Sequence, residues 1–291
     1  MRYIKSLIFL LLVLSPFAAH GDGNLTGGIW QWPTTLLIYS PRYFGPSAFP
    51  IPTLRQGLLS SQYEVEVRGE YHHYSGDITK DLFLRAMFPI VRGRAAIEIR
   101  FIALEDYKTT PETRDERHAA DVECPPNESY MGDVVISALY QLWKSKKWFD
   151  AMFSLNLKTA SGGRLCDARF TDAATYWIDV TAGKNILGTE GGNHLRLRAM
   201  AGFYCWMTNN LLHRQNDAFS YGAGLTGVVN ALSLSSDISG FSGYENNGDH
   251  PLLLRNNVSI EYRKNVLSLR YDHGMGDSLY DTYSVGFIRK F

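Results

Sequence analysis

Apolar and polar residues alternate with a period of two along most of the chain that follows residue 61. The stretch Tyr63–Tyr71 puts its tyrosines and valines on one parity, and it puts on the other Glu64, Glu66, Arg68 and Glu70. Successive side chains of a strand point to opposite faces, so this stretch predicts a strand with one apolar and one charged face. A charged face does not lie in a dry core without partners, so it must face water or a polar lumen.

The same alternation recurs and predicts about twelve strands, most of them roughly 9–13 residues long, which suits tilted strands that cross a bilayer. The predicted strands lie near 61–71, 82–88, 97–101, Val134–Leu142, Phe149–Lys158, Tyr176–Lys184, Leu195–Trp206, Phe219–Asn230, Leu232–Tyr244, Leu253–Arg263, Val266–His273 and Tyr280–Phe291. The weakest is Leu232–Tyr244, because its alternation breaks around Ser235-Ser236.

Connection lengths give a second, independent indication. Every second connection is short, as at residues 91–94, 144–147, 230–231 and 263–265, with a somewhat longer one at 188–193. The connections between them are longer and polar, and include Lys108–Tyr130 and residues 161–173, 208–217 and 246–250. Short turns at one end and long loops at the other are typical of bacterial barrels. The prediction is an all-β, antiparallel transmembrane β-barrel over residues 62–291.

The last stretch, Tyr280–Phe291, resembles the closing strand of Gram-negative outer-membrane barrels, whose chains end in Phe after alternating apolar residues. Arg289 departs from that pattern and is expected to snorkel toward the headgroups. The resemblance implies an outer-membrane location, contact with membrane lipid, and a barrel-assembly machinery that reads the final strand through Phe291.

A shorter resemblance concerns residues 158–163, Lys-Thr-Ala-Ser-Gly-Gly. They are similar to a Lys-x-Pro-Thr-Gly segment of the barrels associated with the meta-pathway of phenol degradation, with Ala160 in place of the proline. That family implies an outer-membrane carrier of small aromatic compounds.

The chain before the strands differs in kind. Arg2, Lys5, the apolar run Leu7–Leu14 and small residues up to Gly21 predict a signal peptide over residues 1–21. Residues 22–61 hold a series of prolines that exclude a helix or a ladder strand, namely Pro41, Pro46, Pro50 and Pro52. This segment either packs in extended form on an apolar surface or forms a plug that enters the lumen or closes the periplasmic mouth.

Composition agrees with an exported barrel. The chain has 29 basic and 29 acidic residues, and loss of Arg2 and Lys5 with the signal peptide changes the net charge from +0 to near −2. This balance gives no reason to expect nucleic-acid binding. The 17 Tyr, 15 Phe and 6 Trp suit aromatic girdles. The aromatics near strand ends are Tyr71, Tyr140, Trp143, Trp148, Tyr176, Tyr262 and Tyr271.

The odd cysteine count argues against a disulfide framework. A single disulfide between Cys124 and Cys166 remains a possibility, and Cys205 is expected to be a small apolar residue of a strand.

The predicted lumen face carries the candidate functional residues. By parity they are Glu64, Glu66, Arg68, Glu70, Arg85, Glu98, Arg100, Asp150, Lys158, Asp179, Arg196, Arg198, Glu261, Arg270 and Asp272. Either these charges pair with one another in a sealed barrel, or they line a pore that selects solutes. Both signs occur throughout, which argues against strong anion or cation selectivity.

Histidines and serines raise two further possibilities. His72 and His73 are adjacent, so their side chains point to opposite strand faces and do not readily share a metal ion. Some outer-membrane barrels are lipid hydrolases, with His73 or His273 as the candidate base here, and lumen-parity serines at Ser220, Ser259, Ser268 and Ser284, but no GxSxG elbow occurs. The sequence therefore favours a channel or carrier for a small-molecule solute without catalytic residues, metal or cofactor. The alternatives are a sealed, partner-binding barrel and a lipid-modifying enzyme.

Overall fold

A computed structural model describes residues 37–119, 130–145, 147–189, 191–208 and 213–291. The predicted signal peptide, the first part of the Pro-rich segment and Cys124 lie outside these residues. The described residues belong to one compact unit, Pro33–Phe291. Its helices are short, namely the 3₁₀ turns η3 (Pro41–Tyr43) and η4 (Leu165–Asp167) and the α-helix α2 (Pro111–Glu116). Among the described residues, no helix is both long and apolar enough to cross a membrane.

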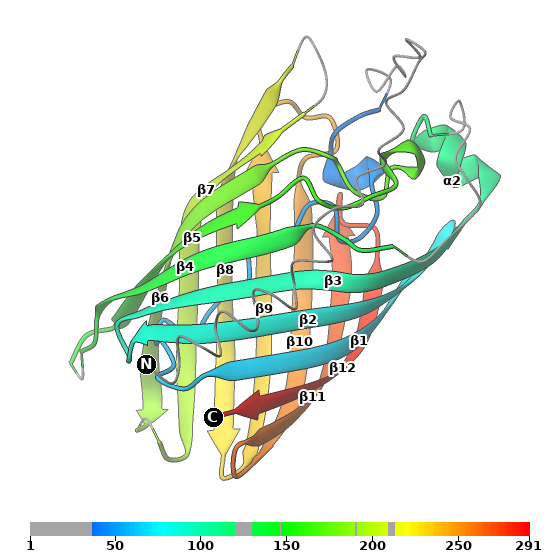
Figure 1. Cartoon of the computed structure of the whole chain (residues 1–291). Coiled ribbons are helices and arrows are strands. Elements are labelled where there is room, and N and C mark those ends of the chain that lie inside the picture. Colours follow the sequence, from blue (N-terminus) through cyan, green and yellow to red (C-terminus); the bar gives the residue numbers. More distant parts are fainter. Residues whose placement is uncertain (1–36, 120–129, 146, 190, 209–212) are drawn as a thin grey trace, which may run out of the picture. The chain divides into compact units, whose positions relative to one another are not determined.

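Twelve antiparallel strands form a closed barrel, in which each strand pairs with its neighbours in sequence and β1 pairs with β12 (Figure 1). The strands are β1 (Glu64–Tyr74), β2 (Asp77–Val91), β3 (Ala95–Thr109), β4 (Val134–Trp143), β5 (Asp150–Lys158), β6 (Thr175–Gly188), β7 (His194–Met207), β8 (Gln215–Val229), β9 (Leu232–Gly243), β10 (Pro251–Tyr262), β11 (Asn265–Gly276) and β12 (Asp281–Lys290). The predicted twelve-strand antiparallel barrel is confirmed. Even the weakest predicted strand, around Ser235-Ser236, is continuous as β9.

The outward parity of the strands is apolar and exposed. On β12, for example, Tyr283, Val285 and Phe287 are exposed, whereas Ser284 on the other parity is buried. Exposed aliphatic side chains continue around the wall, including Val65, Val67, Ile136, Leu155, Leu197, Leu225, Leu234, Ile260 and Leu269. So large an apolar surface is unfavourable in water and is the surface that a lipid bilayer covers.

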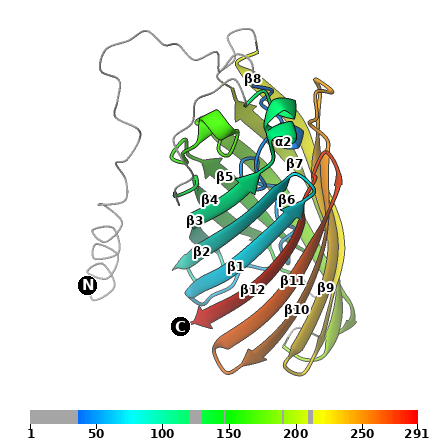
Figure 2. The same cartoon turned by 90° about the vertical axis from the view of Figure 1, so that its right-hand side faces the viewer.

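The two ends of the barrel differ in their connections. Tight turns at one end place Gly93 (φ 66°), Asn230 (φ 53°) and Arg263 (φ 56°) in the left-handed region, and we call this the short-turn end. The other end, which we call the long-loop end, carries α2 and η4 (Figure 2). The first residue of β1 pairs with the last of β12, Glu64 with Lys290, so both lie at the short-turn end.

Aromatic residues of the predicted girdle lie on the surface. Tyr71, Tyr140, Trp143, Trp148 and Tyr262 are exposed, and Tyr176 and Tyr271 are half-buried. Arg289 donates to Asn265 Oδ1 at 2.7 Å, and its guanidinium lies 5.8 Å from the centre of the Phe291 ring. The charge that breaks the alternation of β12 is thus accommodated at the very end of the strand.

Candidate functional site

Residues 37–61, which we call the inner segment, contact inward-facing side chains from several strands. At the long-loop end, Trp206 Nε1 of β7 donates to the Tyr39 carbonyl at 2.8 Å. At the short-turn end, the backbone N–H of Leu59 donates to Gln141 Oε1 of β4 at 2.7 Å. The inner segment therefore runs along the interior of the barrel from one end to the other before β1 begins (Figure 1).

Arginines of β7 hold the backbone of the inner segment against the wall. Arg196 Nε donates to the Gln56 carbonyl at 2.8 Å, and Arg198 Nη1 donates to the Leu54 carbonyl at 3.0 Å. The inner segment lies so close to β6 at Gly183 that a side chain there would not fit. A Cβ on Gly183 would lie 2.3 Å from the Gln56 carbonyl oxygen. The facing Gly57 has a φ of 72°, which glycine adopts without strain.

An aromatic cluster fills the interior beside β6–β9 near the long-loop end. Its rings come from both the wall and the inner segment: Phe44, Phe49, Trp177, Tyr204, Trp206 and Phe241. Tyr204 stacks on Phe241 with ring centres 4.3 Å apart, and Phe49 meets Trp206 edge-on at 5.8 Å. The inward face is therefore apolar in this region, because the inner segment brings apolar groups here and the wall packs against them.

Alternating charges occupy the opposite side of the interior. Glu66 accepts from Arg68 Nη1 and from Arg85 Nε, both at 2.7 Å. Glu98 accepts from Arg85 Nη1 at 3.1 Å and from Arg55 Nη2 at 2.8 Å. Arg55 belongs to the inner segment, so this chain of ion pairs also ties the segment to β1, β2 and β3.

A cavity of about 390 Å³ lies beside these charges. Its lining combines arginines, carboxylates and aromatic rings: Arg55, Arg68, Arg85, Arg100, Arg255, Arg270, Glu66, Glu70, Glu98, Asp133, Asp272, Phe83, Phe101, Phe170 and Tyr280. The Arg68 guanidinium stacks 3.9 Å from the centre of the Phe83 ring. The cavity thus offers both cationic donors and flat apolar surface to a small molecule.

Two arginines of this lining form no ion pair with a described carboxylate. Arg100 donates to Thr53 Oγ1 at a long 3.4 Å, and Arg270 Nε has no hydrogen-bond partner. Neighbouring arginines take the nearby carboxylates, as Arg255 does with Asp272 at 3.3 Å. A guanidinium removed from bulk water without a counter-charge is costly, so both side chains favour an anion in the cavity.

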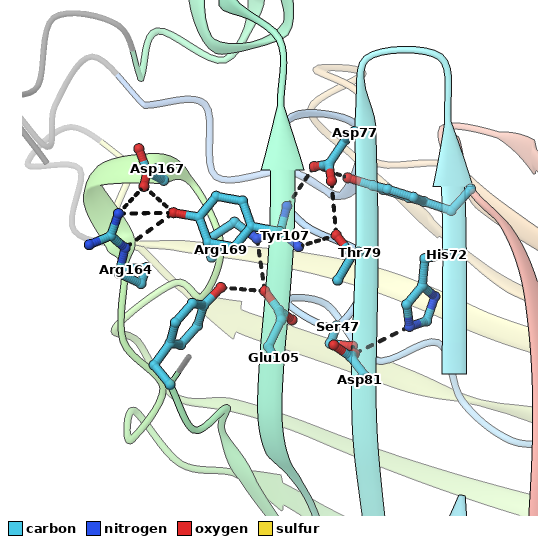
Figure 3. A network of polar contacts seen from close by, with 12 residues as sticks. Ser47, His72, Asp77, Thr79, Asp81, Glu105, Tyr107, Arg164, Asp167 and Arg169 are labelled. Carbon is cyan, nitrogen blue, oxygen red and sulfur yellow. Dashed lines mark hydrogen bonds and ion pairs between the residues drawn. The ribbon is translucent and has the colours of Figure 1, made fainter. Parts of the chain in front are cut away.

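A second polar cluster lies at the long-loop end (Figure 3). Asp77 Oδ2 accepts from Arg169 at 2.5 Å and from Tyr280 at 2.7 Å. It also accepts from Arg117 at 2.8 Å. Burial alone would lower the pKa of Arg169, but Glu105 and Asp77 hold that pKa well above its ordinary value. Arg117 and Arg169 come from the long loops, so these bonds fasten the loops over the barrel.

The Lys158 segment that resembles the phenol-degradation barrels has a clear structural role. Lys158 Nζ donates to Asp133 Oδ2 at 2.5 Å, to Thr171 Oγ1 at 2.8 Å and to the Ala173 carbonyl at 3.1 Å. Asp133 Oδ1 accepts in turn from the backbone N–H groups of Ser161 and Gly162 at 2.9 and 2.7 Å. Lys158 therefore joins the start of β4 to the loop between β5 and β6.

The structure divides the fifteen predicted lumen residues into three groups. The cavity is lined by Glu66, Arg68, Glu70, Arg85, Glu98, Arg100, Arg270 and Asp272. Other inward contacts are made by Asp150, Lys158, Asp179, Arg196 and Arg198. Glu64 and Glu261 lie at the short-turn end and pair with Arg85 at 3.0 Å and with Lys290 at 2.7 Å.

Sequence reasoning missed several residues that belong to the same interior. Arg255 shares the parity of Asn257, Ser259 and Glu261 on β10, so the alternation could have identified it. No periodic pattern covers the inner segment, and nothing in the sequence pointed to Arg55 or Ser47.

Cys166 is disulfide-bonded, and Cys205 is a buried free cysteine in β7.

No protein-family model and no curated protein matches the chain. Solved structures do. An outer membrane channel from Pseudomonas putida F1 superposes with a TM-score of 0.56 at 11% sequence identity, covering 84% of this chain and 98% of that one. The NanC porin superposes with a TM-score of 0.53 at 10% identity, covering 78% and 100%. The chain has the fold of outer-membrane β-barrel channels. At these identities the similarity concerns the fold alone.

Proposed function

We propose that this protein is an outer-membrane channel or carrier that passes a small solute through its charged interior. The observation that carries the proposal is a cavity of about 390 Å³, lined by charged side chains and by rings, inside a barrel whose outer wall is apolar. The apolar wall favours a lipid bilayer as its surroundings. The predicted signal peptide and the final strand, with Phe291 as the assembly signal, favour the Gram-negative outer membrane and its assembly machinery.

The chemistry of the cavity supports a small anionic solute that carries an aromatic or other flat apolar group. Arg100 and Arg270 provide guanidinium groups without carboxylate partners among the described residues, and Phe83 and Phe101 provide ring surface. Arginine binds carboxylates in a two-point geometry and also stacks on rings. An aromatic carboxylate such as benzoate matches both features, and the resemblance of residues 158–163 to carriers of small aromatics is consistent with it.

The inner segment acts as a plug in this proposal. Polar contacts hold much of it, including the Arg55–Glu98 ion pair and the bonds from Arg196 and Arg198. In this proposal these polar contacts exchange with water when solute enters, and only the part of the segment beside the charged wall shifts. Its prolines also lower the entropy that is lost when it orders in the lumen.

Conductance in planar lipid bilayers tests the proposal. The mature protein is compared with a variant that lacks residues 37–57, and heat-modifiable gel migration first verifies that both are folded. Removal of the inner segment should raise the single-channel conductance several-fold, and a salt gradient should give a reversal potential on the anion side. Replacement of Arg100 and Arg270 by alanine should reduce that anion preference.

A folded deletion variant that stays electrically silent would contradict transport and favour a sealed, partner-binding barrel. A specific observation makes this the second candidate, since most interior charges are paired and the inner segment occupies the lumen. We propose no catalytic role. If the protein hydrolysed lipid, and if replacement of His73 and His273 abolished this activity, the proposal that it has no catalytic role would be wrong.

A further inference from the structure

Three carboxylates face one another across the inner wall near the long-loop end. Glu70 of β1 is paired directly with Asp81 of β2, and Asp81 is paired directly with Glu105 of β3. All three lie on the inward parity, and Asp81 and Glu105 are buried. Like charges directly opposite each other on neighbouring strands are destabilising, so this row requires cations.

The partners that the described residues supply leave two carboxylate oxygens of this row unsatisfied. Arg68 Nε donates to Glu70 Oε1 at 2.8 Å, and Arg169 Nε donates to Glu105 Oε1 at 2.8 Å. Asp81 Oδ1 and Glu105 Oε2 are nevertheless buried without a hydrogen-bond partner. A buried carboxylate oxygen without a partner is unfavourable by about 1–3 kcal/mol. Two such oxygens in one row indicate that a positive group belongs there.

His72 supplies a nitrogen ligand at the same place. Its Nδ1 lies 2.7 Å from Thr282 Oγ1, and its Nε2 lies 3.2 Å from Asp81 Oδ2. Thr282 Oγ1 can donate or accept, so both tautomers of His72 fit; with the proton on Nδ1, the lone pair of Nε2 points toward the Asp81 carboxylate and is available to a cation. A hydrogen bond on the far ring nitrogen is how proteins orient a metal-binding histidine.

We propose that His72, Asp81 and Glu70 form a binding site for a divalent transition-metal ion of the zinc type. Their ligand atoms all lie within 4.8 Å of one another, and ligands around a single tetrahedral zinc ion lie about 3–4 Å apart. One imidazole with carboxylates is a donor set that suits zinc, whereas calcium prefers oxygen ligands alone. His73 takes no part in this site, because its side chain is on the exposed face of β1, and Asp81 comes from the neighbouring strand β2.

The site is accessible from the cavity and is connected to the inner segment. Glu70, His72 and Ser47 all line the cavity. Ser47 Oγ of the inner segment donates to Asp81 Oδ2 at 3.0 Å, and Figure 3 shows Ser47, Asp81 and His72 pointing toward one another. A bound ion would therefore link β1 and β2 next to the point where the inner segment touches the wall.

Zinc binding to the purified mature protein in detergent micelles tests the site. Isothermal titration with zinc chloride should show one ion per folded chain, and calcium chloride at the same concentration should give no such binding. His72→Ala and Asp81→Asn should each weaken zinc binding at least tenfold. Zinc should also raise the unfolding temperature of the wild-type protein but not of these two variants.

His73→Ala is the matched control, because His73 is the next residue but lies on the exposed outer face. It should bind zinc like the wild type. Loss of binding in His73→Ala or His273→Ala, with retention in His72→Ala, would place the ion on the outer wall beside Asp281 and overturn the proposal. A folded wild-type chain that binds no zinc, or that binds calcium equally well, would overturn it too. Heat-modifiable migration verifies folding of each variant.

Discussion

The two sides of the barrel interior are built on different principles. Beside β6–β9, aromatic side chains of the wall pack on the inner segment in a dry cluster around Trp206 and Phe241. Beside β1–β3 and β10–β12, the wall is charged and a cavity remains. Both sides belong to strands with the same alternating pattern. The difference shows that one side fixes the inner segment, while the other leaves space for a ligand.

Packed rings stabilise a fold, whereas a guanidinium group without a counter-charge is available to bind an anion. The charged side holds several of its carboxylates in ion pairs, such as Glu98 with Arg55 and Arg85. Its remaining cations, Arg100 and Arg270, have no such partner. Substitutions on the packed side should therefore change mainly the free energy of unfolding, and substitutions of the unpaired arginines should change mainly the binding of solute.

The largest effect is expected on the packed side. Trp206→Ala removes a fully buried ring and its hydrogen bond to Tyr39, and should lower the free energy of unfolding by about 4 kcal/mol. Trp148→Ala is the matched control, because Trp148 is 72% exposed and its loss should change stability by less than about 0.5 kcal/mol. Urea unfolding of the micelle-bound protein measures both. Equal losses would show that the interior cluster is not a core.

Glu98→Gln should produce the next largest effect. It keeps the shape of the side chain but leaves Arg55 and Arg85 without their shared carboxylate, which should lower stability by about 3 kcal/mol. Because Arg55 belongs to the inner segment, the same change should raise single-channel conductance. Glu261→Gln removes an exposed pair with Lys290 and should have little effect on either quantity. Similar results for the two variants would refute the role given to the interior pairs.

A smaller effect is expected where the inner segment meets the wall. In Gly183→Ala, the added Cβ would lie 2.3 Å from Gln56 O, so the segment must move. Stability should fall by about 2 kcal/mol and conductance should increase. Gly69→Ala provides the comparison, since no atom lies within 4 Å of its Cβ position. Unchanged conductance in Gly183→Ala would mean that the segment at Gln56 does not limit passage.

The smallest change in stability should come from Arg100→Ala and Arg270→Ala. Neither side chain pairs with a described carboxylate, so each loss should alter the free energy of unfolding by less than about 1 kcal/mol. The variants should nevertheless bind benzoate at least tenfold more weakly, as fluorescence or calorimetric titration would show. A large loss of stability with unchanged benzoate binding would assign these arginines to folding instead.

The alternation of residues was sufficient to predict the strands, their order and the face on which most charges lie. It works because side chains on a strand alternate strictly, and because lipid and a polar interior demand opposite chemistry on the two faces. The lengths of the connections also predicted which end of the barrel has the short turns and which has the long loops. Glu66, Arg68 and Glu98 could therefore be placed on the inward parity from the sequence alone.

Only the tertiary structure decided which inward residues meet. Closure of the barrel and the path of the inner segment bring Arg55 to Glu98, and Arg169 to Asp77 across 92 residues of sequence. They also divide one apparently uniform lumen face into a packed side and a hollow side, and place Ser47 beside Asp81. The physical reason is that periodicity specifies the direction of a side chain but not its distance from residues on distant strands or in a segment without any period.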